Sequence, residues 1–245
     1  MTPVTISSLA IIVFAAIIHA SFQLSISVLT LLSGHSIGKK TAQRKIFRMS
    51  TSFVFGVSII TLLLISAVSY YLSLFIRHIT SAEQLVAAIA SGMMLGLGLA
   101  IWAFYYRRQP GTSLWVPRGF AEYLNKRTKK TRNSIESFAL GLTSVIAEII
   151  FILAPILAAA LAIITLPNPL LQITSIITYT LISILPLSII IILVGSGHNI
   201  SNLQRWREKH KRFLQFVSGG SLLILGAFIF VDRVIGVISY GGNLW

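Results

Sequence analysis

Cysteine is absent from this sequence of 245 residues, and acidic side chains are few. Without cysteine the chain can form no disulfide, no thiolate metal site and no thiol redox centre. Six Asp and Glu stand against twenty Lys and Arg, and charged residues make up only 11% of the chain, whereas apolar residues make up 55%. Soluble domains carry about 25% charged residues, so this composition excludes an ordinary solvated surface and predicts a membrane protein.

Apolar residues gather in six long runs, at about 7–33, 51–76, 84–106, 135–165, 170–194 and 213–239. Each run has at least the roughly 20 helical residues that cross a hydrocarbon core of about 30 Å. The runs are nearly continuous in Leu, Ile, Val, Ala and Phe, whereas barrel strands alternate polar and apolar residues. We therefore predict an all-α polytopic membrane protein with six transmembrane helices. No basic residue precedes the first run, so we expect it to stay in the mature protein.

All the basic residues except Arg77 and Arg233 lie in the loops after the first, third and fifth runs, at 34–49, 107–133 and 195–212. Such loops share one side of the membrane, and the positive-inside rule places them in the cytoplasm. Both termini then lie outside a cytoplasmic (plasma) membrane. No motif that reads nucleic-acid bases is present, so we expect the basic loops to contact anionic lipid headgroups and no nucleic acid.

Two short patterns recur between the halves of the chain. Spans three and six both carry a glycine pair six residues apart, Gly92-Met-Met-Leu-Gly96-Leu-Gly98 and Gly220-Ser-Leu-Leu-Ile-Leu-Gly226. Spans one and four carry Ser21-Phe22-Gln23-Leu24-Ser25-Ile26 and Ser137-Phe138-Ala139-Leu140-Gly141-Leu142. Chance similarity between short membrane segments is the alternative to a repeat.

Each half has three spans, an odd number, so a second copy would enter the membrane from the opposite side. We therefore predict a 3+3 inverted repeat, with a first three-helix repeat at 1–106, a basic cytoplasmic linker at 107–134 and a second three-helix repeat at 135–245. Inverted repeats are common in secondary transporters, whose halves move about a site near the middle of the membrane.

Polar residues within the spans are candidates for that site, because burying them is costly unless they are paired or face a cavity. On span one, a helical period aligns His19, Gln23, Ser27 and Thr30 in one stripe, and on span four it aligns Gly141, Ser144, Glu148, Pro155 and Ala159. Glu148 is the only acidic residue deep within a span. It suits a proton relay or a cation ligand, or else a neutral hydrogen bond to a neighbouring helix.

The other members of these arcs have simpler explanations. His19 can serve only to satisfy a neighbouring polar group, and Pro155 frees backbone carbonyls and can bend span four. Small residues favour close helix contacts, which we predict at Gly92, Gly96, Gly98, Gly219, Gly220 and Gly226. Asp232 and Arg233 are expected at the membrane interface, with an extracellular gate as the alternative.

The segments GMMLGLG, GSLLILG, HASFQLS and GLTSVIAEIIFILAPIL together resemble the lysine exporter superfamily. That group includes amino-acid exporters, divalent-metal exporters and the membrane domain of the thiol-disulfide electron carriers of cytochrome c biogenesis. The resemblance implies a six-span exporter with its site between spans one and four.

Two departures from this group narrow the function. Pro155-Ile156-Leu157 resembles the Pro-Ile-Leu that follows the second Pro-Cys element of the electron carriers, but no cysteine is present and thiol electron transfer is excluded. His19-Ala20 is similar to the start of the nickel and cobalt permease signature. Leu24-Ser25 stand where that signature has Asp-His, which argues against a tight nickel site.

We therefore expect a transporter that exports a small molecule or ion by alternating access, with proton coupling through Glu148 as an option. The alternatives are a non-transporting membrane subunit or assembly factor and, with less support, a membrane-embedded enzyme. One Glu and one His are few for an active site, so we expect no catalytic residues, no metal and no cofactor. The sequence leaves the substrate and the oligomeric state open.

Overall fold

The structure, a computed structural model, describes residues 3–22, 28, 40–79, 81–104, 118–196 and 209–236. The described residues form helices and no strand. The helices are α1 (Pro3–Ser21), α3 (Lys40–His78), α4 (Ala82–Phe104), α5 (Arg118–Lys130), α6 (Ser134–Ile164), α7 (Pro169–Gly195), α9 (Lys211–Ile229) and the π-helix η1 (Phe230–Ile235).

Six of these helices are long and apolar enough to cross a membrane: α1, α3, α4, α6, α7, and α9 with η1. This confirms the predicted all-helical membrane fold. The basic segments differ from the prediction in two places. α3 begins at Lys40 rather than near residue 51, and its 39 residues extend about 58 Å, which exceeds the roughly 40–45 Å of a bilayer with its headgroups. The predicted linker contains α5, which has 13 residues and is too short to cross.

The start of α6 is set by a local cap. The side chain of Asn133 accepts a hydrogen bond from the backbone N–H of Glu136 at 2.8 Å, and the Glu136 carboxylate accepts one from the N–H of Arg132 at 2.8 Å. Reciprocal caps of this kind satisfy backbone donors at the first turn of a helix, and a capping residue contributes about 0.5–2 kcal/mol. The polar linker therefore ends at Asn133, and the apolar sequence that follows enters the bundle.

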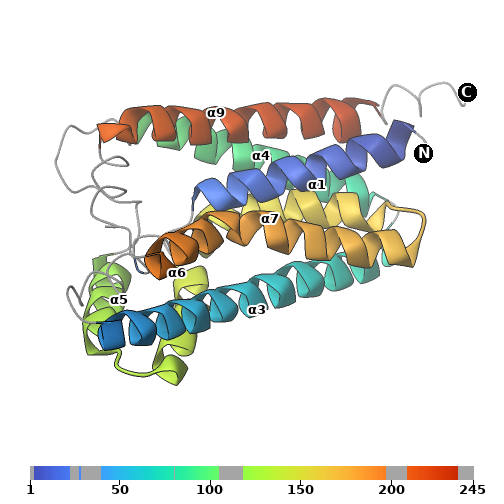
Figure 1. Cartoon of the computed structure of the whole chain (residues 1–245). Coiled ribbons are helices and arrows are strands. Elements are labelled where there is room, and N and C mark those ends of the chain that lie inside the picture. The colour runs from blue at the N-terminus through green and yellow to red at the C-terminus, as the bar shows by residue number, and fades with distance from the viewer. Residues whose placement is uncertain are drawn as a thin grey trace, which may run out of the picture.

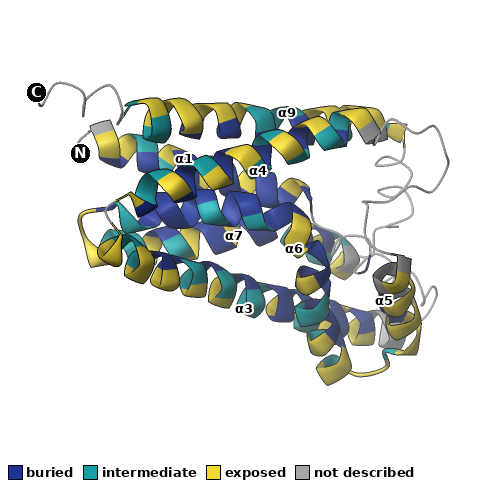
Figure 2. Cartoon of the chain, turned by 180° about the vertical axis from the view of Figure 1, so that it is seen from behind, coloured by how far each residue is buried: buried dark blue, intermediate teal, exposed yellow. Residues whose placement is uncertain are grey.

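Both described ends of the chain lie at one end of the bundle, as Figure 1 shows, and α5 and the first turns of α3 lie at the other. We call these the terminal end and the basic end. α6 is the most deeply buried of the spanning helices, and in Figure 2 the dark blue of buried residues gathers in the middle of the bundle, between α4 and α3. α6 contacts α1, α3, α4, α5 and α7.

Named contacts give the relative directions of the helices. α1 and α6 are antiparallel, because Ser8 contacts Thr165 and Phe22 contacts Phe151. α3 and α6 both start at the basic end and cross closely there, where the hydroxyl of Ser52 donates to the carbonyl of Ser134 and an added methyl group at Gly141 would overlap the carbonyl oxygen of Phe53 (Figure 1). These directions agree with the odd and even order of the spans.

Glycines allow close contact between α4 and α9. A methyl group added at Gly98 would lie 2.9 Å from the carbonyl oxygen of Gly219, and one at Gly226 would lie 3.2 Å from that of Ser91. A methyl group at Gly219 would overlap the ring of Trp102, at 2.5 Å from its Cδ1, whereas one at Gly220 would make an ordinary contact of 3.6 Å with the same ring. Side chains larger than glycine would therefore separate these two helices.

Gly92 and Gly96 differ from the other predicted packing glycines. Within the described part of the chain, a methyl group added at either position meets no atom within 4 Å. Both residues lie on the exposed face of α4. The close contacts expected at these two positions are therefore not made between described helices of this chain.

Candidate functional site

His19 and Tyr179 form a buried polar pair between α1 and α7. The Nδ1 atom of His19 lies 2.9 Å from the hydroxyl oxygen of Tyr179, and the ring centroids are 5.7 Å apart. Both side chains are almost completely shielded, at 1% and 0% exposure. The Nε2 atom of His19 is also buried and makes no hydrogen bond to any residue that the structure describes. A polar pair therefore lies inside the apolar bundle, with one nitrogen left to bind something else.

Phe22 and Phe151 stack beside this pair and join α1 to α6. Their ring centroids are 5.8 Å apart and their planes differ by 15°. Phe22 follows His19 by three residues, and Phe151 follows Glu148 by three residues. Because α1 and α6 are antiparallel, His19 lies on the side of the stack toward the terminal end, and Glu148 lies on the side toward the basic end.

Glu148 is buried, with 1% exposure, on the side of α6 that faces the bundle interior. Ser144, one turn earlier, is also buried, and its hydroxyl donates to the carbonyl of Gly141 at 2.8 Å. Pro155 is buried in the same helix at about the level of His19, and its missing N–H removes the helical hydrogen bond to the carbonyl of Phe151. The predicted arc on span four therefore does face protein.

Thr61 on α3 is a further buried polar residue that the sequence did not single out. Its exposure is 0%, and its hydroxyl makes no hydrogen bond to a described residue. Ser137 donates to the carbonyl of Met49 at 2.7 Å, at the crossing of α6 and α3. Thr61 lies twelve residues after Met49 on α3, and Glu148 lies eleven residues after Ser137 on α6.

Toward the terminal end, small and branched apolar side chains close the bundle above His19. The buried residues of α1 and α6 in this layer include Ile11, Ile12, Ala15, Ala16, Ala158, Ala159, Ala160 and Ala162. They bring α1 and α6 together without a polar group. An apolar layer therefore separates His19 from the terminal end along the contact of α1 with α6.

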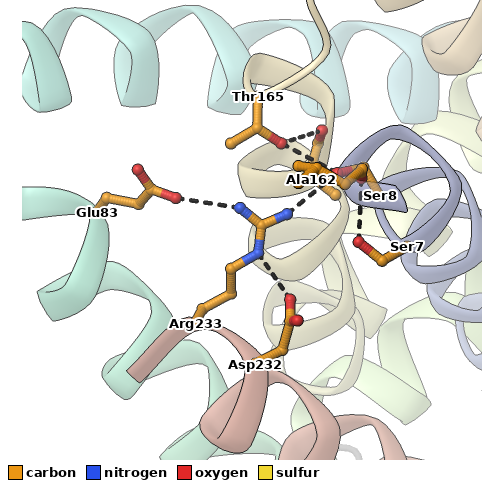
Figure 3. A network of polar contacts seen from close by, with 8 residues as sticks. Ser7, Ser8, Glu83, Ala162, Thr165, Asp232 and Arg233 are labelled. Carbon is orange, nitrogen blue, oxygen red and sulfur yellow. Dashed lines mark hydrogen bonds and ion pairs between the residues drawn. The ribbon is translucent and has the colours of Figure 1, made fainter. Parts of the chain in front are cut away.

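A polar network that we call the terminal clasp lies beyond this apolar layer (Figure 3). The guanidinium of Arg233 in η1 donates to Glu83 at 3.2 Å, to Asp232 at 3.0 Å and to the hydroxyl of Ser8 at 3.1 Å. Ser8 contacts the hydroxyl of Thr165 at 3.2 Å. The clasp joins α1, α4, η1 and the end of α6.

The sequence placed Arg233 at a membrane interface but did not identify its partners. Its side chain is 11% exposed and pairs with Glu83, 150 residues earlier. Arg233 and Glu83 carry opposite charges, and both lie at span ends on the outer side of the membrane in the predicted topology. This combination of charge and position is a sequence signal that could have paired them. Ser8 and Thr165 carry no comparable signal.

The structure describes four of the seven predicted pathway residues. His19, Glu148 and Pro155 lie along one contact between α1 and α6, with Ser144 one turn farther toward the basic end. Gln23, Ser27 and Thr30 fall outside the described residues.

The described side chains contain no group of three or more His, Cys, Asp or Glu positioned to hold a metal. Comparison of the chain with known proteins finds no matching family model, no similar curated protein and no similar solved structure.

Proposed function

We propose that this protein is a membrane transporter that moves a small molecule or ion, as an exporter, by alternating access with proton coupling through Glu148. The observation that carries the proposal is the burial of two titratable side chains, His19 and Glu148, on either side of the Phe22 and Phe151 stack. Ionisable residues inside membrane spans are expensive to bury, and they usually mark ion pathways or proton relays.

An inverted repeat would make His19 and Glu148 equivalent residues. An offset of 129 residues matches Ser8 to Ser137, Phe22 to Phe151 and His19 to Glu148. At this offset residues of α1 have counterparts in α6, and most pairs agree in burial. Both residues are buried in the pairs 8/137, 11/140, 12/141, 15/144, 16/145, 18/147, 19/148 and 22/151. Both are exposed in the pairs 6/135, 10/139, 17/146 and 21/150. Burial therefore favours this register over the offset of 116 suggested by the motifs at Ser21 and Ser137.

Contacts between α4 and α9 support the same exchange of halves. An offset of 128 residues matches Gly98 to Gly226 and Ser91 to Gly219. Gly98 lies close to the carbonyl of Gly219. When each of these residues is replaced by its counterpart in the other half, the contact becomes that of Gly226 with the carbonyl of Ser91, and the structure contains this contact as well. Such paired contacts are expected about a two-fold axis in the membrane plane.

α3 and α7 complete the correspondence. An offset of 118 residues matches Thr61 to Tyr179, and the pairs buried in both helices are 57/175, 61/179, 65/183, 69/187 and 72/190. Each half then contributes one titratable side chain and one buried hydroxyl, His19 with Tyr179 and Glu148 with Thr61. The stack of Phe22 on Phe151 would lie on the axis, because exchanging the halves converts each residue into the other.

This arrangement suits alternating access. The apolar layer and the terminal clasp lie between His19 and the terminal end, and in the proposed cycle they form the seal of the described state. In an inverted repeat, the second state exchanges the conformations of the two halves, so the seal would form at the basic end and the site would open at the terminal end. Glu148 would carry a proton between these states, because a carboxyl surrounded by apolar groups is most easily moved in its neutral form.

The test uses the full chain reconstituted into liposomes on a solid-supported membrane. Currents are recorded after jumps in pH and after jumps in the concentration of amino acids and of mono- and divalent cations. We expect currents that Glu148→Gln abolishes and that Glu122→Gln, which removes an exposed carboxyl of α5, leaves unchanged. A folded Glu148→Gln protein with normal currents would show that the carboxyl is structural. A wild-type protein without currents under all these conditions would favour the non-transporting subunit.

A further inference from the structure

A groove of about 990 Å³ lies at the basic end, where α3 and α6 begin. Its lining includes Arg44, Lys45, Phe47, Arg48, Phe55 and Ser134. The three cations are exposed, as are the two phenylalanines, and the groove has no carboxylate in its lining. It is therefore positively charged at one end and apolar along its walls.

The charged and apolar parts are separated along α3. Arg44, Arg48, Thr51 and Phe55 follow one another at spacings of four, three and four residues, which places them on one face of the helix. Arg48 lies 29 residues from Arg77 at the far end of α3, or about 43 Å, close to the headgroup-to-headgroup thickness of a bilayer. If Arg48 and Arg77 mark the two headgroup regions, Phe55 is about 10 Å deeper than Arg48, at the depth of the acyl chains.

Contacts among the helices hold the walls of the groove in place. The hydroxyl of Ser52 donates to the carbonyl of Ser134 at 2.6 Å, and the rings of Phe55 and Phe138 lie 6.0 Å apart. The ring of Phe47 lies against α7, where a methyl group added at Gly195 would be 3.0 Å from it. The groove is therefore lined by side chains of α3 and α6, and Phe47 in its wall packs against the end of α7.

We propose that this groove binds one anionic phospholipid, with its phosphate between Arg44 and Arg48 and an acyl chain against Phe47 and Phe55. Guanidinium groups bind phosphate oxygens through paired hydrogen bonds, and basic pockets between membrane helices accept anionic headgroups. A free phosphate would use the arginines but not the aromatic walls, whereas a lipid uses both. The inference does not depend on transport, because it rests on the groove alone.

The bound lipid would join the two halves of the bundle. α3 precedes the basic linker and α6 follows it, and the groove lies where these two helices meet. The negative phosphate of one lipid there would reduce the repulsion among the three cations, and its acyl chain would fill the space between the first turns of both helices. We expect it to stabilise the contact of α3 with α6.

Native mass spectrometry of the purified full chain in detergent can test this site. The protein is titrated with phosphatidylglycerol and with phosphatidylcholine of the same acyl chains. We expect one tightly bound phosphatidylglycerol, and for the double variant Arg44→Gln/Arg48→Gln an affinity lower by about 25-fold, or about fivefold for each arginine. The matched control, Lys129→Gln/Lys130→Gln, removes the same charge from α5 outside the groove and should retain the wild-type affinity.

Two further measurements separate a lipid from a free anion. Phe55→Ala should weaken the binding of phosphatidylglycerol, and soluble glycerol phosphate should compete only at far higher concentrations. The proposal is wrong if phosphatidylcholine binds as tightly, if the control variant loses as much affinity as the arginine variant, or if glycerol phosphate competes as well as the lipid. Circular dichroism of each variant checks that it is folded.

Discussion

The rings of Phe22 and Phe151 stack at 5.8 Å, and each residue lies three positions after a buried titratable side chain. This stack places His19 and Glu148 on opposite sides of one aromatic contact between α1 and α6. Apolar residues of α1 and α6 separate His19 from the terminal end, and Glu148 lies on the side of the stack toward the basic end. The stack is therefore the natural boundary between the two polar regions of the bundle.

The His19 and Tyr179 pair should contribute measurably to stability. Tyr179→Phe removes the hydroxyl and leaves His19 Nδ1 without this partner in an apolar interior. We expect a loss of about 0.5–1.7 kcal/mol, the range of hydrogen bonds between membrane helices. Thermal unfolding in detergent measures it. Tyr71→Phe, at a tyrosine that is 68% exposed, is the control, and an equal effect of both changes would show that the buried pair adds nothing.

Glycines that are alike in sequence should respond differently to added volume. Gly141→Ala places a methyl group against the backbone carbonyl of Phe53, and relieving that overlap by moving α3 from α6 should cost about 1–3 kcal/mol. Gly96→Ala adds the same methyl group where no described atom lies within 4 Å. We expect it to leave the unfolding temperature unchanged or slightly raised. Equal destabilisation by the two substitutions would contradict the observed packing.

The orientation in the membrane can be measured cleanly, because the chain has no cysteine of its own. Ser81→Cys introduces a thiol at the terminal end, and Lys129→Cys introduces one at the basic end; both positions are exposed. The positive-inside rule predicts that an impermeant maleimide labels Ser81→Cys in intact cells and Lys129→Cys only after lysis. The reverse pattern would invert the predicted topology.

The terminal clasp should control access more than stability. The carboxylates of Glu83 and Asp232 are 41% and 36% exposed, so water can hydrate them when Arg233→Gln removes their partner. The unfolding free energy should therefore change by only about 1 kcal/mol or less. If the clasp keeps the terminal end closed, a cysteine at Ala15, in the apolar layer, should react several times faster with an impermeant reagent when Arg233 is replaced. Arg77→Gln is the control. If the cysteine at Ala15 reacts at the same rate with and without Arg233→Gln, the terminal clasp does not control access from the terminal end.

The sequence alone determined the class of this protein, its six spans and its two chemically different ends. These properties follow from total apolar length and from the placement of basic residues, which need no knowledge of neighbours. Composition also identified Glu148 and His19, because titratable groups within long apolar runs are conspicuous. The helical period correctly placed Ser144 and Glu148 on one face of span four, and the structure shows that this face is buried.

Only the tertiary structure decided which side chains meet. Tyr179 is one hydroxyl among many in span five, and nothing local pairs it with His19, 160 residues earlier. Gly96 and Gly98 read alike in sequence, yet Gly98 contacts α9 and Gly96 does not. The reason is physical: in a membrane protein both the lipid face and the packed face are apolar, so hydrophobic pattern does not reveal which face of a helix touches protein.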